Sequence, residues 1–167
     1  MNRLIFLVFI TLVYGDIQKD FFNKKYSKIC SVKNIYKYKN NDKILSIIGK
    51  ACLNIDSIYL LPRISKFLIH TKEGRANSLY FLTIVLQKRL IYNYLFDKIP
   101  LNSFNLPMTD YLISYIFYKI KDNQFIKKEN KIIIKKGDIT YMIYKEKDKM
   151  FVDKYKNNKL IKKRWYR

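Results

Sequence analysis

Apolar residues recur every three or four positions through the first three quarters of the chain, which is the spacing of one face of an α-helix. In residues 20–38 this stripe predicts one amphipathic helix, and a second stripe beyond the polar break at residues 39–42 predicts another. We expect Asp42 to cap the second helix, because its carboxylate can accept from the free N–H groups of a first turn. The two stripes, which together predict a helical hairpin, are Phe22, Tyr26, Ile29, Val32, Tyr36 and then Ile44, Ile48, Ala51, Cys52, Ile55.

The same spacing predicts further helices over residues 61–71, 75–96 and 110–122. Pro62 suits the first turn of a helix, so we expect a turn or a kink just before it. Thr109 is expected to cap the last of these helices. These segments complete an N-terminal body of about four to five helices arranged as helical hairpins.

Residues 79–86 are apolar on almost every side, a composition that also occurs in membrane-spanning helices. Gln87, Lys88 and Arg89 follow directly, and each charge would cost about 2.5–3.5 kcal/mol at the centre of a bilayer. The apolar run is also much shorter than the roughly 20 residues that a span requires. We therefore expect a core helix here rather than a transmembrane segment.

Beyond Asn123 the helical period gives way to alternation, the pattern of a β-strand. Short runs rich in Ile, Tyr, Phe and Val are separated by polar breaks of about three or four residues, which predict antiparallel hairpins. One face of the sheet is expected to cover the helices, because so small a meander is not stable by itself. The expected strands, about four or five in number, are residues 125–128, 131–136, 139–145, 149–155 and 160–166.

The first residues have the pattern of a secretory signal peptide. Arg3 precedes an apolar run over residues 4–14, which as a helix would rise roughly 16 Å, about half of the hydrocarbon core of a bilayer. The run ends at the small residue Gly15, and this combination is typical of a signal that is removed. An N-terminal core helix and an uncleaved anchor are the alternatives. No transmembrane span is expected in the mature chain.

These patterns divide the chain into a signal peptide over residues 1–15, a helical-hairpin body over residues 16–122 and a basic antiparallel β-meander over residues 123–167 that packs on the helices. The expected fold class is therefore α+β. Export would place the mature chain in the periplasm of a Gram-negative bacterium or outside the cell.

Cys30 and Cys52 are the two cysteines of the chain. They are equally distant from residue 41 in the polar break, so an antiparallel pair of helices brings them level. Two thiols in an oxidising compartment usually form a bond, and closing this loop would stabilise the fold by roughly 3 kcal/mol. We predict a structural disulfide; free buried thiols and a reactive role are the alternatives.

The chain carries 34 Lys and Arg against 13 Asp and Glu, a net charge of +21 at pH 7. A field of this size attracts polyanions such as lipid head groups, envelope polymers and nucleic acid. The alternative is a solvated lysine surface that results from AT-rich codon usage. Residues 125–167 hold 15 basic and 5 acidic residues, a net +10, so the meander is the expected contact region.

The end of the meander interleaves cations with aromatic rings. Cations can grip phosphate groups while rings stack on bases or sugars. The alternative is an edge strand that its lysines keep from pairing with other chains. The expected binding residues are Lys154, Lys162, Lys163, Arg164, Trp165, Tyr166 and Arg167.

No catalytic, metal-binding or cofactor-binding pattern stands out in the sequence. His70 is the single histidine and is expected to cap a helix end or to lie partly buried. Metal sites need clusters of His, Cys or carboxylate groups, and the glycine-rich loops that bind nucleotides do not occur. We therefore expect neither a metal nor a cofactor.

The sequence thus favours a non-enzymatic periplasmic or secreted protein that contacts an anionic envelope component, such as a polymer or a lipid surface, or a partner protein. Nucleic acid is a less favoured partner. Two other functions stay open: a secreted cationic effector or toxin acting on membranes or nucleic acid, and a small hydrolase that uses a pair of carboxylates.

If the chain is exported and cleaved, protein recovered from a periplasmic fraction should begin at or near Asp16, because Gly15 ends the apolar run. Intact-mass measurement checks this start. Full-length protein retained in the inner membrane would contradict the signal peptide and weaken the argument from an oxidising compartment.

Overall fold

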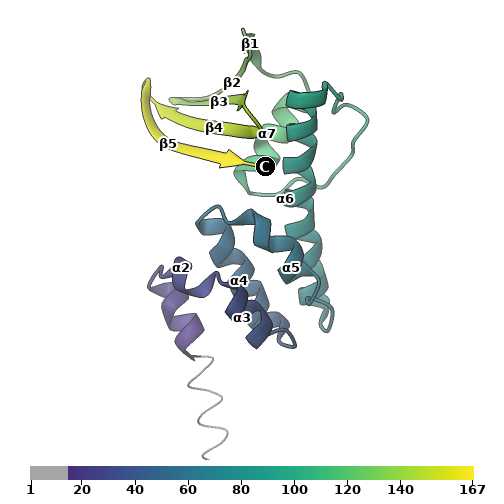
Figure 1. Ribbon diagram of the computed structural model, residues 1–167, viewed down its shortest axis with the longest axis vertical. Helices are drawn as coiled ribbons and strands as arrows, with labels where there is room; N and C mark the ends of the chain where they lie inside the picture. Colours follow the sequence, from purple (N-terminus) through teal and green to yellow (C-terminus); the bar gives the residue numbers. More distant parts are fainter. Residues whose placement is uncertain (1–14) are drawn as a thin grey trace, which may run out of the picture. The chain divides into compact units, whose positions relative to one another are not determined.

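The computed structural model describes residues 15–167, and in them a series of helices precedes an antiparallel sheet (Figure 1). The predicted α+β class is confirmed. The predicted signal peptide, apart from Gly15, lies outside the described residues. In chain order the elements are α2 (Tyr26–Ile29), α3 (Val32–Lys37), α4 (Asp42–Asn54), the 3-10 helix η1 (Ile58–Leu60), α5 (Leu61–Ser65), α6 (Lys72–Asp97), α7 (Leu112–Lys121), β1 (Ile126–Lys128), β2 (Lys131–Lys136), β3 (Ile139–Glu146), β4 (Lys149–Lys156) and β5 (Lys159–Tyr166).

The described residues form two compact units, one that ends at Val85 and one that runs from Leu86 to Arg167. The long helix α6 contributes its first part to the first unit and its last part to the second. No helix within residues 15–167 is both long and apolar enough to cross a membrane.

The single helix predicted over residues 20–38 is wrong, because the chain breaks it twice. Residues 15–22 are helical, and Lys24 then takes a left-handed conformation with φ of 57°. After α2, the Ser31 hydroxyl accepts from the backbone N–H of Asn34 at 3.2 Å and so starts α3 as a new helix. The predicted apolar stripe is only partly buried: Ile29 lies in the core, whereas Phe22, Val32 and Tyr36 are exposed and Ile35 is buried instead. The local capping decides where the helices end.

The start of α4 also differs from the prediction, because Asn41 and not Asp42 is the cap. The Asn41 side chain accepts from the backbone N–H of Ile44 at 3.0 Å. Asp42 lies one residue inside the helix, where its side chain is buried.

The Asp42 carboxylate instead ties the start of α4 to the start of α6. It accepts from the Thr71 backbone N–H at 2.7 Å and from the Thr71 hydroxyl at 3.0 Å, and it lies 3.1 Å from His70 Nδ1. An ionised carboxylate only accepts, so His70 Nδ1 carries the proton in this bond. Burial raises the pKa of Asp42, but the hydrogen bonds from Thr71 and His70 outweigh burial and hold that pKa below its ordinary value.

Gly74, expected to precede the helix, instead lies within the first turn of α6. Its N–H donates to the Thr71 hydroxyl at 2.9 Å, so Thr71 caps this helix. A Cβ at Gly74 would lie 2.0 Å from an oxygen of Asp42. The close approach of the two helix starts therefore requires glycine here, although glycine is a poor helix former.

The predicted disulfide is confirmed: Cys30 and Cys52 are joined, with their Cα atoms 5.0 Å apart. Cys30 directly follows α2 and Cys52 is fully buried on α4. The bond holds α2 against α4. Further along, α5 ends at Ser65, so the helix expected up to residue 71 is shorter than predicted, and Pro62 lies in its first turn as expected.

In the second unit, the loop between α6 and α7 is held by hydrogen bonds from both helices. Gln87 Nε2 donates to the Pro107 carbonyl at 3.0 Å, and the Tyr118 hydroxyl donates to the Leu106 carbonyl. The predicted cap at Thr109 is wrong, because α7 begins at Leu112 after Tyr111, without a side-chain cap. The backbone N–H of Thr109 instead donates to the Ser114 hydroxyl at 2.8 Å.

The five strands form one antiparallel sheet in sequence order, close to the predicted ranges (Figure 1). Each pair of neighbouring strands is joined by only two residues, fewer than the three or four expected: 129–130, 137–138, 147–148 and 157–158. The first residue of every turn has positive φ, as two-residue hairpin turns require. These short turns fix the register of the first four strands, and a β-bulge at Lys154 and Tyr155 shifts the pairing of β4 with β5 by one residue.

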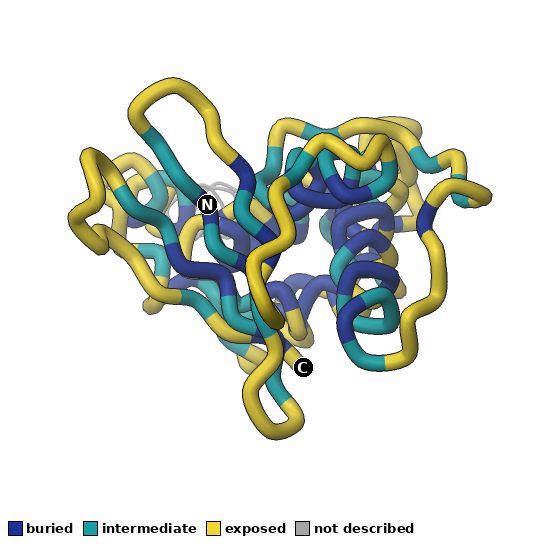
Figure 2. The backbone as a smooth tube through the Cα atoms, turned by 90° about the horizontal axis from the view of Figure 1, so that it is seen from above, coloured by how far each residue is buried: buried dark blue, intermediate teal, exposed yellow. Residues whose placement is uncertain are grey.

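Within β2, β3 and β4 the more deeply buried residues alternate with less buried ones. Figure 2 colours the backbone by burial. We call the covered side the inner face. It packs against α7, where the rings of Tyr115 and Tyr141 meet with centroids 6.0 Å apart. The core residues of this face are Ile132, Ile134, Tyr141, Ile143, Met150, Val152 and Tyr166.

Replacing Asp42 with Asn should lower the free energy of unfolding by about 1.5–3 kcal/mol at neutral pH, since buried donors lose a charged acceptor. The folded-state pKa of Asp42 is lowered, so its contribution is complete above the pKa of an unfolded aspartate and is lost as pH falls through the folded value. Denaturant unfolding at neutral pH and at about pH 3 should show the difference shrink.

The matched control is Asp138→Asn, which removes an exposed carboxylate 3.5 Å from Lys156 Nζ. Exposed ion pairs contribute little, so we expect a change below about 1 kcal/mol. An Asp42→Asn variant as stable as this control would contradict the role of Asp42.

Replacing both Cys30 and Cys52 with Ser should lower the free energy of unfolding by roughly 3 kcal/mol, because the bond closes a loop with a sequence separation of 22. Denaturant unfolding of parent and variant, with and without a reductant, measures the effect. An unfolding midpoint of the parent that the reductant leaves unchanged would argue against a stabilising bond.

Candidate polyanion-binding face of the sheet

The register of the meander aligns aromatic side chains in one row across three strands. Tyr144 on β3 is the Cα partner of Phe151 on β4, and Phe151 is the partner of Trp165 on β5. Lys131 on β2 extends the row, because it is the partner of Tyr144. Partners in an antiparallel sheet point to the same side. This row lies on the side opposite to the inner face.

Lysines surround this row and contact its rings. Lys163 Nζ lies 4.7 Å from the centroid of the Phe151 ring, and Lys149 Nζ lies 4.3 Å from that of Trp165. Both distances are within the range of a cation–π interaction. We call the surface formed by Lys131, Tyr144, Lys149, Phe151, Lys163 and Trp165 the aromatic–lysine face.

The exposure of the rings decreases from β5 towards the middle of the sheet. Trp165 is 55% exposed, whereas Tyr144 and Phe151 are half-buried. The Tyr144 and Phe151 rings stack with centroids 5.3 Å apart and an interplanar angle of 13°. The face therefore combines a rigid pair of rings with one ring that solvent reaches.

Asp153 lies in the neighbouring row and holds part of this arrangement in place. Its carboxylate is buried, and Oδ2 accepts from the Tyr144 hydroxyl at 3.1 Å. Asp153 is also the Cα partner of Lys163. Oδ1 of Asp153 is buried and accepts no hydrogen bond within residues 15–167. The negative charge of Asp153, beside the aromatic–lysine face, orients Tyr144 and attracts Lys163.

Burial raises the pKa of the Tyr144 hydroxyl; Lys163 opposes this shift and Asp153 adds to it. Tyr144 therefore keeps its proton at neutral pH and donates to Asp153. A hydrogen bond with the Tyr144 oxygen is the main cause that raises the pKa of Lys163. Lys163 thus stays positively charged over the whole physiological range.

The pleat of the sheet separates the residues that the sequence grouped together. Lys163 and Trp165 belong to the aromatic–lysine face. Lys154, Lys162, Arg164 and Tyr166 point to the inner side, and of these Tyr166 is part of the core.

Arg167, the last predicted binding residue, is engaged at the end of the chain. Its guanidinium lies 2.8 Å from a carboxylate oxygen of Asp148, and its carbonyl accepts from Lys88 Nζ. Burial, with Arg89 adding to it, lowers the pKa of Lys88. Arg167 thus connects β5 to the β3–β4 turn and to α6.

The sequence interpretation missed Lys131, Tyr144, Lys149 and Phe151, because apart from Lys154 it considered only the last strand and the residue that follows it. Alternation in residues 139–145 already places Tyr144 opposite to Tyr141. The signals that were lacking are the turn lengths and the β-bulge at Lys154 and Tyr155, because the bulge shifts β5 by one residue and so brings Trp165 opposite Phe151.

The aromatic–lysine face offers ammonium groups for anions and rings for stacking, but it offers no acid–base pair in a cleft. Across the described part of the chain, no group of three or more His, Cys, Asp or Glu side chains could hold a metal ion. What this face offers chemically is charge for anions and a ring for stacking.

Comparisons of the chain with protein-family models, with curated protein sequences and with solved structures find no match.

Proposed function

We propose that the protein is a non-enzymatic, extracytoplasmic binding protein that contacts an anionic envelope glycan through its aromatic–lysine face. The observation that carries this proposal is the exposed Trp165 ring beside Lys149 and Lys163. An exposed ring can stack on a sugar, and flanking ammonium groups attract the phosphate or carboxylate groups of such a polymer.

Two further features support this location and this class of ligand. A disulfide between Cys30 and Cys52 is typical of proteins in oxidising compartments. The net charge of +21 favours negatively charged polymers over neutral ones. Lipid surfaces and nucleic acid share the negative charge, so they serve as the competing ligands in the test.

The test compares two double variants that remove the same charge from the same two strands. Lys149→Gln with Lys163→Gln alters the aromatic–lysine face, and Lys154→Gln with Lys162→Gln alters the inner side. Binding to lipopolysaccharide, phosphatidylglycerol vesicles and single-stranded DNA is measured over a salt series. For duplex DNA the slope of log affinity against log salt is about 0.9 per neutralised phosphate, so losing two contacts should flatten it by roughly two.

We expect the first double variant to bind lipopolysaccharide more weakly and with a flatter salt slope, and the second to bind as the parent does. Trp165→Ala should weaken binding with little change of slope, since a ring releases no counterions. Thermal unfolding verifies that each variant is folded. Equal losses in both double variants would show that general charge and not this face binds, and tighter binding to single-stranded DNA would favour the nucleic-acid effector.

A further inference from the structure

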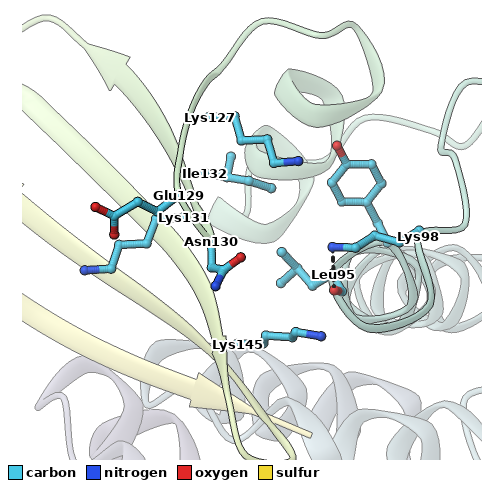
Figure 3. A pocket seen from close by; sticks show the side chains of 9 residues that line it. Leu95, Lys98, Lys127, Glu129, Asn130, Lys131, Ile132 and Lys145 are labelled. Carbon is cyan, nitrogen blue, oxygen red and sulfur yellow. Dashed lines mark hydrogen bonds between the residues drawn. The ribbon is translucent and has the colours of Figure 1, made fainter.

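A second basic site lies within the second unit, between the last turn of α6 and the hairpin of β1 and β2 (Figure 3). It is a cavity of about 430 Å³, which falls in the usual range for small-molecule sites. Leu95 on α6 and Ile132 on β2 are buried and form its apolar base. Tyr94 also lines it.

The pleat of the sheet directs lysines into this cavity. Lys127 on β1 is the Cα partner of Ile132, so both point to the inner side of the sheet. Lys145 on β3 follows Ile143 by two residues and therefore shares that side. The strands β1 and β3 thus each place one lysine ammonium group beside the same apolar base.

The end of α6 adds a third ammonium group. Lys98 has φ of 61°, the left-handed conformation that ends many helices and usually favours glycine. Its Nζ donates to the Leu95 carbonyl at 3.3 Å, which leaves two of its three N–H donors for a ligand. The same geometry that ends the helix therefore presents Lys98 to the cavity.

Figure 3 shows where the charges point. The ammonium groups of Lys98, Lys127 and Lys145 and the amide of Asn130 are directed into the space between the hairpin and α6, whereas Glu129 points to the other side. Lys145 Nζ also lies 5.2 Å from the Phe96 ring centroid, which restrains it near α6. Glu129 also lines the cavity, but its carboxylate is directed away from the three ammonium groups, so the lining is positive overall.

The type of cation indicates the type of anion. Planar carboxylates are matched by the fork of an arginine, and none lines this cavity. Lysines act as point charges and can converge on a compact group with several oxygens, such as a phosphate that carries close to two negative charges at neutral pH. The apolar base suits a small organic body attached to it.

We propose that this cavity binds a phosphomonoester, with Lys98, Lys127 and Lys145 contacting the phosphate. The phosphate can belong to a small soluble ester or to the headgroup of a lipid, and both present the same terminal oxygens. Lys131 lines this cavity and also belongs to the aromatic–lysine face, but the three proposed phosphate ligands do not belong to that face, so the site does not depend on the proposed function.

The experiment uses the full chain and three probes: inorganic phosphate, glycerol phosphate, and phosphatidylcholine vesicles that contain phosphatidic acid. Calorimetry measures binding of the soluble probes and co-sedimentation that of the vesicles. The variant is Lys127→Gln with Lys145→Gln. The matched control is Lys128→Gln with Lys147→Gln, which removes the same charge from the opposite side of β1 and from the β3–β4 turn.

We expect the parent to bind saturably. The Lys127→Gln and Lys145→Gln variant should lose at least tenfold in affinity, roughly the effect of removing charged hydrogen-bond donors. The affinity of the control should change by less than about twofold. A loss with glycerol phosphate indicates a soluble ester, and a loss with the vesicles alone indicates a lipid headgroup. Should the double variant fail to fold in a circular-dichroism melt, the exposed Lys127→Gln replaces it.

Absence of saturable binding to glycerol phosphate and to the vesicles would overturn this site, as would a control that loses as much affinity as the variant. The Lys149→Gln and Lys163→Gln variant leaves Lys98, Lys127 and Lys145 unchanged. Its behaviour towards glycerol phosphate therefore separates a failure of this site from a failure of the aromatic–lysine face.

Discussion

The two-residue turns of the meander, together with a β-bulge at Lys154 and Tyr155 between β4 and β5, determine the register of five strands, and both basic sites depend on that register. A shift of one residue would send every side chain of a strand to the other side of the sheet. Trp165 would then point to the inner face and Lys127 away from its cavity. The Asn157 and Asn158 turn illustrates the constraint, because both residues have positive φ, which asparagine tolerates better than most residues.

The sheet assigns its lysines to two different tasks. On one side they flank rings and leave Trp165 accessible to solvent. On the other side they stand at the rim of an apolar core and, near α6, converge on a cavity. Some contacts also stabilise the sheet itself, since cation–π and cross-strand pairs contribute in the absence of any ligand. The proposed binding surface and a stable small sheet are therefore built from the same residues.

Two of the connections that hold the first unit join segments that are distant in sequence and position the starts of its helices. The disulfide joins α2 to α4, and Asp42 joins the start of α4 to the start of α6. Gly74 is required because the second connection leaves no room for a Cβ. The disulfide explains how α2, which is too short to be stable alone, persists in the fold.

The sequence by itself determined the order of helices and strands, the approximate strand ranges and the pairing of Cys30 with Cys52, because these follow from hydrophobic period and from distance to a turn. It did not determine the caps at Asn41 and Thr71, since several polar residues near each helix start could serve and only packing selects one. It also grouped Lys162 with Lys163, whereas alternation along β5 places them on opposite sides. The lysine cavity was beyond sequence reasoning, because Lys98, Lys127 and Lys145 come from three elements that only the tertiary structure brings together.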